Sequence, residues 1–344
     1  MNHDREITPL EMFWRVALMS AIPLLPFVVA YIWLDPYKVL RSYDDYFSDG
    51  LGVNKGVVTI KTFKELYPVY GYDSFILGAS ISCYYQAHEW IKCLPNGAKP
   101  FHMDSSGQTI HNTRLFLEYI DRECAEIDNV LIVCSPYVLK IAYDENSLYG
   151  VIPPDVACGG WKYVWNFHYN FFKRLSTYHY YASFIPWKLH GKQEDLMRDE
   201  HIFELQPISY EESVNEESIP QWDREIETDS AGFYSRHEIH IPDKDAPYEV
   251  CERLIDENMQ DDFRRIAEIL RRRGASYKII VSPTLQLEVL CDEDDRFLRS
   301  IFGDGYVNLT REFREELSDR KNWYDNTHYR PVLATKFMQR AYGG

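Results

Sequence analysis

The chain has 344 residues, 45% of them hydrophobic and 15% aromatic, so it is long and apolar enough to bury at least one α/β core. Its net charge of −16 argues against a nucleic-acid partner, because nucleic-acid binding needs a basic surface. The seven cysteines show no CxxC motif and no His/Cys metal spacing, and no Gly-rich phosphate loop is present, so we expect neither a metal nor a cofactor.

The first predicted element is a membrane helix over residues 13–34. Its only charged side chain is Arg15, and the apolar run is about long enough to cross a bilayer, although Pro23 and Pro26 would kink it. A cleaved signal peptide is the alternative, but this run is longer than the apolar region of a signal peptide, and no A-x-A cleavage site follows it. The flanking charges do not decide the orientation. We expect a cytoplasmic tail over 1–12 and an extracytoplasmic remainder, because that side suits the chemistry that the later motifs indicate.

After the membrane helix, a polar stretch predicts a stalk or linker over 35–68, which leads into one domain over 69–344. In that domain, short apolar runs alternate with helical patterns. This alternation predicts a parallel, doubly wound sheet of about five strands in a three-layer α/β/α sandwich. The runs that we expect to form the strands are 72–80, 99–107, 129–138, 276–283 and 305–309.

Two stretches between these runs have a helical pattern. The stretch 109–124 places apolar side chains roughly on one face and starts with Thr109, a residue type that favours the N-cap position. The stretch 252–274 repeats apolar residues at intervals of three and four and ends with Gly274, where a helix C-terminus is expected.

The alternation of strands and helices breaks over about 140–247. An aromatic and basic stretch, "WKYVWNFHYNFFKRLSTYHYYASFIPWKLHGK", comes first. An acidic segment follows, in which residues 192–262 hold 22 acidic and 6 basic residues and account for the whole net charge. We interpret 140–247 as an insertion over the sheet that carries specificity or partner contacts; alternatively, its aromatic side chains form a satellite core beneath a lid. The acidic segment lacks ligand-like spacing and is more typical of a solvated face than of a metal site.

The first candidate for a functional residue is Ser80, in "LGAS" at the end of the first predicted strand. In a parallel sheet, ligands bind beyond the carboxyl ends of the strands. A helical pattern, "ISCYYQAHEWIKCL", follows Ser80 at once, and the free backbone N–H groups at a helix N-terminus can stabilise an oxyanion. Gly78 permits a tight turn beside the nucleophile. On its own, a serine at this position is more typical of an N-cap.

A second pair of candidates, Asp325 and His328, lies in "NWYDNTHYRP" near the C-terminus. A serine is a weak nucleophile until an imidazole accepts its proton and a carboxylate orients that imidazole. The Asp-x-x-His spacing brings both side chains to one site in a short loop after the last predicted strand, where they can reach the same carboxyl edge as Ser80. The sequence therefore predicts a triad of Ser80, His328 and Asp325.

In this order, the motifs resemble those of the SGNH (GDSL-like) hydrolase superfamily. "GAS" at 78–80 stands where the family has Gly-Asp-Ser, and "DNTH" at 325–328 stands where it has its terminal Asp-x-x-His. The resemblance covers roughly residues 70–135 and 275–340, and it implies an SGNH/flavodoxin-like sandwich.

The resemblance also implies roles for single residues. Ser80 would be the nucleophile, His328 the base and Asp325 the residue that orients the base. Gly107 of "MDSSGQT" would contribute a backbone N–H group to the oxyanion hole, and Ala79 would lie beside the nucleophile at the same site.

The sequence departs from the family pattern at two places. Ala79 replaces the usual Asp, and the third predicted strand ends in "CSPYV" without the Gly-x-Asn-Asp block that supplies an Asn donor. One oxyanion donor is typically worth ~10²–10³ in rate, so either another group substitutes or the reaction is less demanding. The same departures occur in the membrane-anchored branch of the superfamily that this chain resembles most, which includes the D-alanyl transfer protein of teichoic acids and alginate-type O-acetylation proteins.

By that resemblance, we expect a membrane-anchored, extracytoplasmic protein that transfers acyl groups, most simply acetyl, to a cell-surface or exported polysaccharide through an acyl-serine. Its expected partners are the polysaccharide acceptor, the membrane and a membrane-bound O-acyltransferase. Two alternatives stay open: a carbohydrate esterase (deacetylase), which needs the same triad, and a non-catalytic polysaccharide-binding adaptor on an SGNH scaffold.

Overall fold

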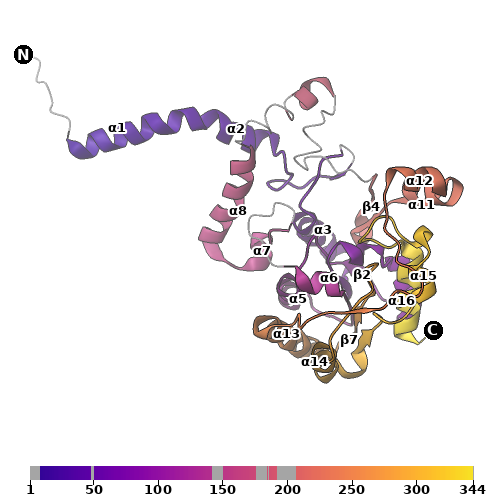
Figure 1. Cartoon of the computed structure of the whole chain (residues 1–344). Helices are drawn as coiled ribbons and strands as arrows, with labels where there is room; N and C mark the ends of the chain where they lie inside the picture. Colours follow the sequence, from indigo (N-terminus) through magenta and orange to yellow (C-terminus); the bar gives the residue numbers. More distant parts are fainter. Residues whose placement is uncertain are drawn as a thin grey trace, which may run out of the picture.

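The protein consists of a long N-terminal helix joined to a globular α/β part, as the computed structural model in Figure 1 shows. The described residues are 8–47, 50–141, 150–175, 184, 186–191 and 207–343. The globular part is built on a five-stranded parallel sheet with the strand order β2-β1-β3-β7-β9. Its strands are β1 (Ser74–Gly78), β2 (Pro100–His102), β3 (Asn129–Cys134), β7 (Ser276–Val281) and β9 (Tyr306–Asn308). Each lies within one of the five runs predicted to form strands, so the prediction of a parallel sheet is confirmed.

The central strands of the sheet are buried on both faces. β1 and β3 pair in parallel, with Phe75 opposite Val130 and Leu77 opposite Ile132. All four side chains are at most 1% exposed. Burial on both faces requires a continuous apolar run rather than an alternating one, and that pattern made these strands recognisable in the sequence.

Two groups of helices pack on the sheet. α5 (Ile110–Glu123) packs against α13 (Glu257–Arg273), which packs in turn against α14 (Asp292–Phe302), whereas α16 (Pro331–Tyr342) packs against α4 (Ala87–Trp90). Right-handed crossovers place these two groups on opposite faces of a sheet with this strand order. The arrangement is consistent with the expected three-layer α/β/α sandwich.

Both helices predicted from apolar periodicity are present, with the predicted caps. Thr109 Oγ1 accepts the backbone N–H of Asn112 at 3.2 Å at the start of α5. Gly274 adopts the left-handed conformation that ends α13, with a φ of +67°. α13 starts later than expected, because Asp256 caps it by accepting the backbone N–H of Met259 at 2.8 Å.

Residues 55–68, which the sequence analysis assigned to a stalk, form most of α3 (Lys55–Tyr70). Phe63 on the buried face of α3 packs against Phe101 and Tyr119, with ring centroids 5.5 and 5.9 Å away. α3 therefore belongs to the sandwich. Residues 55–60 of α3 are all buried although they include the polar Lys55 and Thr59, so the sequence shows no apolar stripe along one face that would have indicated this helix.

The N-terminal element is an almost unbroken helix over Pro9–Leu34, made of α1 (Pro9–Ala21), η1 (Ile22–Leu24) and α2 (Leu25–Leu34). It is long and apolar enough to cross a membrane, and almost all of it is exposed. The 3₁₀ turn η1 contains Pro23 and interrupts the α-helix where a proline kink was expected. Figure 1 shows α1 projecting away from the globular part.

The insertion expected over about 140–247 is described in part. Its described elements are α7 (Pro154–Ala157), α8 (Gly160–Leu175), β4 (Ser209–Glu211), η4 (Glu212–Val214), β5 (Glu216–Ser218), α11 (Pro220–Thr228) and α12 (Ser230–Arg236). Phe167 and Phe171 of the aromatic stretch are buried in one cluster with Tyr31 of α2, which supports the satellite-core interpretation for these side chains. Residues 176–183 of the aromatic stretch and 192–206 of the acidic segment lie outside the described part of the chain.

Several short elements connect the larger ones. β4 and β5 form an antiparallel hairpin, which carries two of the acidic residues near the site described below, and β6 and β8 form a separate parallel pair. The short elements not yet given are η2 (Ser80–Tyr84), η3 (Ile91–Cys93), α6 (Pro136–Lys140), β6 (Glu249–Val250), β8 (Glu288–Val289), η5 (Gly303–Gly305), α15 (Arg314–Leu317) and η6 (Arg320–Asn322).

Candidate active site

Three of the predicted site residues lie together at the carboxyl end of β1. Ser80 Oγ lies 2.8 Å from His328 Nε2, and His328 Nδ1 lies 2.8 Å from Asp325 Oδ2. These hydrogen bonds join the side chains in the order serine, imidazole, carboxylate. This series of hydrogen bonds allows the imidazole to accept the serine proton while the carboxylate orients the ring.

The end of β1 positions Ser80. Gly78 ends the strand with a φ of +155°, and a Cβ atom on it would lie 2.6 Å from the carbonyl oxygen of Val133. Only glycine therefore fits where the end of β1 passes β3. Ala79 continues in an extended conformation, and Ser80 begins η2.

The helical pattern predicted directly after Ser80 is present, but it is not one continuous helix. The stretch forms η2, α4 and η3, three short helices in succession. Helical conformation stops at Tyr85, whose ψ is 76° and whose fully buried hydroxyl lies 3.1 Å from the hydroxyl of Tyr329. This contact with the C-terminal part of the chain overrides the local helical pattern. The backbone N–H groups beside Ser80 are therefore those of a 3₁₀ turn.

Asp325 and His328 are held in one tight turn. Asp325 Oδ1 accepts the backbone N–H of Thr327 at 2.7 Å and that of His328 at 2.8 Å, which leaves Oδ2 for the imidazole. The buried residues Trp323 and Tyr329 pair across the base of this turn in an antiparallel bridge. The Asp-x-x-His spacing is thus stabilised by backbone contacts as well as by the side-chain hydrogen bond.

The electrostatics of the turn keep Asp325 ionised. Burial alone would raise the pKa of this carboxyl group, but the hydrogen bonds and charge of His328, together with hydrogen bonds from Thr327, outweigh burial and lower the pKa to about 2. An ionised Asp325 accepts the Nδ1 proton of His328 and leaves Nε2 available for the proton of Ser80. It also stabilises the imidazolium that forms when that proton moves.

Ser80 and His328 line a small cavity of about 150 Å³. A cavity of this size can receive a small group near the serine oxygen. The other polar residues of its wall are Lys55, Cys83, Tyr84, Asp104, Ser105, Ser106 and Glu217.

The structure does not place Gly107 or Ala79, the two residues expected at the oxyanion site, among the lining residues of this cavity. Gly107 is exposed. Ala79 is buried, and its carbonyl oxygen accepts the backbone N–H of Ser82 at 2.8 Å and the hydroxyl of Ser82 at 2.7 Å. Two serines of the same loop as Gly107, Ser105 and Ser106, line the cavity instead.

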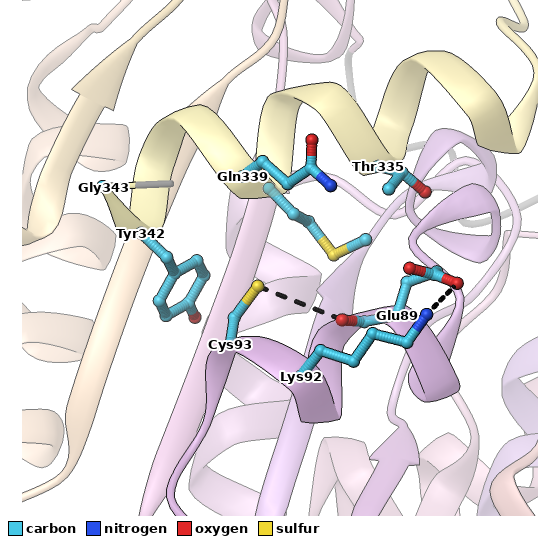
Figure 2. A pocket seen from close by; sticks show the side chains of 8 residues that line it. Glu89, Lys92, Cys93, Thr335, Gln339, Tyr342 and Gly343 are labelled. Atoms are coloured by element: carbon cyan, nitrogen blue, oxygen red, sulfur yellow. Dashed lines mark hydrogen bonds and ion pairs between the residues drawn. The ribbon is translucent and has the colours of Figure 1, made fainter.

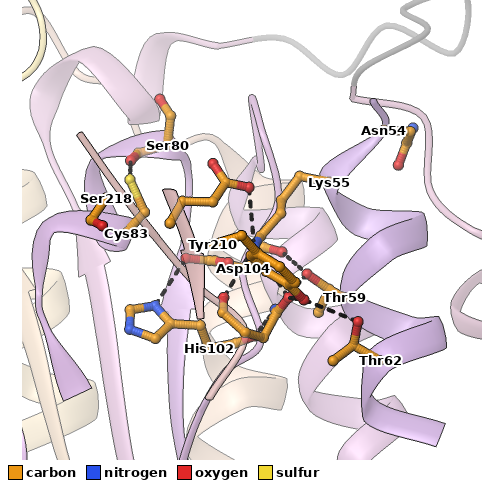
Figure 3. Close-up of polar contacts among 12 residues, drawn as sticks. Asn54, Lys55, Thr59, Thr62, Ser80, Cys83, His102, Asp104, Tyr210 and Ser218 are labelled. Atoms are coloured by element: carbon orange, nitrogen blue, oxygen red, sulfur yellow. Dashed lines mark hydrogen bonds and ion pairs between the residues drawn. The ribbon is translucent and has the colours of Figure 1, made fainter. Parts of the chain in front are cut away.

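A buried lysine lies in the cavity wall, and the sequence analysis missed it. Lys55 Nζ lies 3.1 Å from Oε1 of Glu217 and 3.1 Å from Oδ1 of Asn215 (Figure 3). Burial would lower the pKa of Lys55, but the negative charge of Glu217 outweighs burial and raises the pKa above its usual value. No local pattern could have revealed this site, because its partners lie in the acidic segment, 160 or more positions away.

A second buried charge lies beside the lysine. His102 is fully buried, with Nδ1 3.2 Å from Asp104 Oδ2 and Nε2 3.5 Å from Glu216 Oε2. Burial would lower the pKa of His102, but the hydrogen bond with Asp104 and the negative charges of Asp104 and Glu216 outweigh burial and raise the pKa to about 9. Glu216 also accepts the backbone N–H of Ala87 at 2.7 Å. This cluster therefore ties β2, the β4–β5 hairpin and α4 together around the cavity.

A larger cavity, of about 390 Å³, lies between η3 and α16 (Figure 2). Glu89 and Lys92 form an ion pair at 2.6 Å on its wall, beside Cys93. This wall holds no serine or histidine that could form a nucleophile–base pair. Within the described part of the chain, no group of three or more His, Cys, Asp or Glu side chains is placed to hold a metal ion. The Ser80 cavity is the candidate active site, because Ser80 and His328 on its wall are hydrogen-bonded to each other.

The comparisons with known proteins do not identify a family. No protein-family model matches the chain, and no curated protein matches its sequence. The resemblance to the SGNH superfamily therefore stays a prediction, which rests on the order of the motifs and on the geometry of Ser80, His328 and Asp325.

Proposed function

We propose that the protein is a serine acyltransferase of the SGNH type, anchored in a membrane by Pro9–Leu34. The observation that carries the proposal is the hydrogen-bonded series of Ser80, His328 and Asp325 at the carboxyl end of β1. That edge is where ligands bind in open parallel sheets. The globular part would work outside the cytoplasm, where a cell-surface or exported polysaccharide is the acceptor.

In the first half of the proposed reaction, Ser80 takes the acyl group from its donor. Ser80 Oγ attacks the acyl carbonyl carbon while its proton passes to His328 Nε2, and Asp325 stabilises the imidazolium. The tetrahedral intermediate then breaks its bond to the donor oxygen, and His328 returns the proton to that leaving oxygen. The products are an acyl ester on Ser80 and the free donor alcohol.

The second half repeats these steps with a sugar hydroxyl. The hydroxyl loses its proton to His328 Nε2 and attacks the acyl carbon of the ester. The bond to Ser80 Oγ breaks, and His328 gives the proton back to Ser80. Water in place of the sugar would give hydrolysis by the same steps, so the outcome depends on which hydroxyl reaches the acyl-serine first.

The negative charge on the tetrahedral intermediate needs hydrogen-bond donors. The backbone N–H of Ser80 at the start of η2 is one candidate, as it is in other serine enzymes of this geometry. The hydroxyls of Ser105 and Ser106 are further candidates, because they line the same cavity as Ser80 Oγ. We assign them the role of the missing Asn donor.

Two observations favour transfer of a small acyl group. The cavity of about 150 Å³ suits a group the size of acetyl. The helix Pro9–Leu34 would hold the site near a membrane-side acyl donor at high effective concentration, which fits a partnership with a membrane-bound O-acyltransferase.

Two alternatives have their own support. A carbohydrate esterase would use the same three side chains, with water as the acceptor. A non-catalytic polysaccharide-binding adaptor is favoured by the two departures from the family pattern, Ala79 and the missing Asn block.

One assay separates the three possibilities. The purified full chain in detergent is given an acetyl ester donor, with and without an oligosaccharide acceptor, beside a Ser80→Ala control. Acetylated oligosaccharide that depends on Ser80 supports transfer. Acetate released at one rate, whatever the acceptor, identifies an esterase. Oligosaccharide binding that Ser80→Ala leaves intact, with no turnover by either protein, identifies an adaptor.

A further inference from the structure

α8 has two apolar faces, of which only one is buried in the protein. Phe167 and Phe171 are 2% and 1% exposed and pack in the satellite core. Trp161, Trp165 and Tyr169 are 76%, 70% and 48% exposed. These three follow one another at intervals of four residues, so they lie along one face of the helix. Exposed tryptophans in such a row are costly for a helix that faces only water, and they indicate a surface that contacts something apolar.

The C-terminal half of α8 is joined to the end of the N-terminal helix. Tyr31 in α2 is buried, and its hydroxyl lies 3.0 Å from Nδ1 of His168. The same tyrosine ring packs edge-on against Phe172, with centroids 6.1 Å apart. Figure 1 shows α8 running crosswise to α1 and α2, from the end of α2 along the side of the globular part nearest to α1. Because of these contacts, the depth of α2 in a membrane would also determine the depth of α8.

The two tryptophans of the N-terminal helix indicate how deep this helix would lie in a bilayer. Trp14 and Trp33 are 62% and 74% exposed, and the helix between them rises about 28 Å at 1.5 Å per residue. This span is close to the thickness of the hydrocarbon core, about 30 Å, whose two boundaries tryptophan and tyrosine favour. Trp33 and its neighbour Tyr31 therefore mark one boundary. In such a bilayer α8, which contacts Tyr31 and runs crosswise to the spanning helix, would lie at the level of that boundary.

The charges of α8 fit a membrane surface as well. The sixteen residues of the helix include Lys162, Lys173 and Arg174 and no acidic residue, in a chain whose net charge is −16. An amphipathic helix with tryptophans on one face and basic residues beside them is typical of helices that lie in the lipid interface. Basic side chains at that level are attracted to anionic headgroups.

We infer that α8 is an interfacial helix, which places Trp161, Trp165 and Tyr169 among the lipid headgroups and upper acyl chains of the bilayer that Pro9–Leu34 crosses. The inference rests on the membrane anchor of the proposed function. It adds a second attachment to that anchor, and two attachments fix the orientation of the globular part. The Ser80 cavity then keeps a constant height above the membrane, whereas a single helix would leave it free to swing.

Photo-crosslinking in nanodiscs tests the inference on the full chain. Trp165 is replaced by p-benzoylphenylalanine, and the protein is placed in nanodiscs of phosphatidylcholine and phosphatidylglycerol. Trp33→p-benzoylphenylalanine reports on the anchor, and Val332→p-benzoylphenylalanine is the control, because Val332 is 49% exposed on α16, away from α1. Mass spectrometry of the peptides then identifies the adducts after irradiation. We expect lipid adducts at 165 and 33 and none at 332.

The other outcomes decide against the inference in distinguishable ways. Lipid adducts at 33 without any at 165 would overturn the interfacial role of α8 and leave the anchor intact. Absence of adducts at 33 would overturn the anchor, and the role of α8 with it. Irradiation of the same variants in native membranes distinguishes a lipid from a protein contact. If residue 165 formed adducts with protein alone, the tryptophan face would bind a protein partner and not the bilayer.

Discussion

Ser80 Oγ and His328 Nε2 lie 2.8 Å apart, although 248 positions separate the two residues in the chain. The serine follows the end of β1, and the histidine lies in the turn before α16, at the same edge of the sheet. The pair therefore forms only when the complete sandwich is folded. A fragment that ends before Asp325 would keep the nucleophile and lose both the base and the residue that orients it.

We predict that Ser80→Ala and His328→Ala each lower acyl transfer on the order of 10⁴–10⁶-fold, because both residues act in the same proton transfer. The double variant should be no worse than either single one. The measurement is the rate of acetyl transfer or acetate release by the purified full chain. Ser300→Ala is the control, since Ser300 is exposed on α14, and thermal melting should show all these variants folded. Additive losses in the double variant would contradict a shared step.

Asp325→Asn should lower the rate by about 10⁴-fold, because an amide does not hold the required tautomer of His328 as the carboxylate does. In the wild type, the pKa of Asp325 is lowered to about 2, so loss of this carboxylate does not set the acid limb of the activity profile. The stability that its lowered pKa contributes is present above the unfolded value of about 3.9 and is lost as pH falls through about 2. Rate measurements from pH 4 to 9 check the loss of rate and the acid limb, and thermal melting at lower pH checks the stability, with Asp304→Asn as a control on the exposed surface. An unchanged rate in Asp325→Asn would remove Asp325 from the mechanism.

The strands and the triad-like group could be predicted because each leaves a local pattern in the sequence. Buried parallel strands such as β1 must be apolar on both faces, and Asp325 and His328 are three residues apart within one turn. Their meeting with Ser80 then follows from the general position of ligands at the carboxyl edge of a parallel sheet.

The buried cluster behind the cavity leaves no such pattern. In the sequence, Lys55 looks like an ordinary polar linker residue. Its burial is compensated by Glu217 and Asn215, which are both far away in the chain. The same holds for Glu216. In the sequence it is one of many carboxylates in an acidic segment, and only the folded structure shows that it lies beside His102. Long-range pairs of this kind stabilise a charge only in the folded state, so a single sequence gives no sign of them.

His102 should make the stability of the protein depend on pH. Its pKa is about 9 in the folded state and about 6.5 when unfolded, so the stability it contributes is fully present below pH 6.5 and is lost as pH rises through 9. His102→Gln should remove much of this dependence and cost about 3–5 kcal/mol, since it leaves Asp104 and Glu216 buried without their cation. Urea unfolding between pH 6 and 10 measures both effects. His240→Gln, on the exposed surface, should behave as the wild type, and a wild-type midpoint that does not fall toward pH 10 would contradict a charged His102.

Ser106→Ala tests which group replaces the missing Asn donor. If the Ser106 hydroxyl stabilises the oxyanion, its loss should lower kcat by about 10²-fold and leave KM nearly unchanged, because the hydrogen bond strengthens only in the transition state. Gly107→Ala is the matched comparison in the same loop: it keeps the backbone N–H, and a Cβ atom there meets no other atom within 4 Å. The φ of +64° at Gly107 makes alanine strained, at a cost on the order of 1 kcal/mol in stability, so melting temperatures must accompany the rates. A folded Ser106→Ala variant with normal kcat would exclude this hydroxyl, and the same measurement on Ser105→Ala would then decide whether either serine of the loop is a donor.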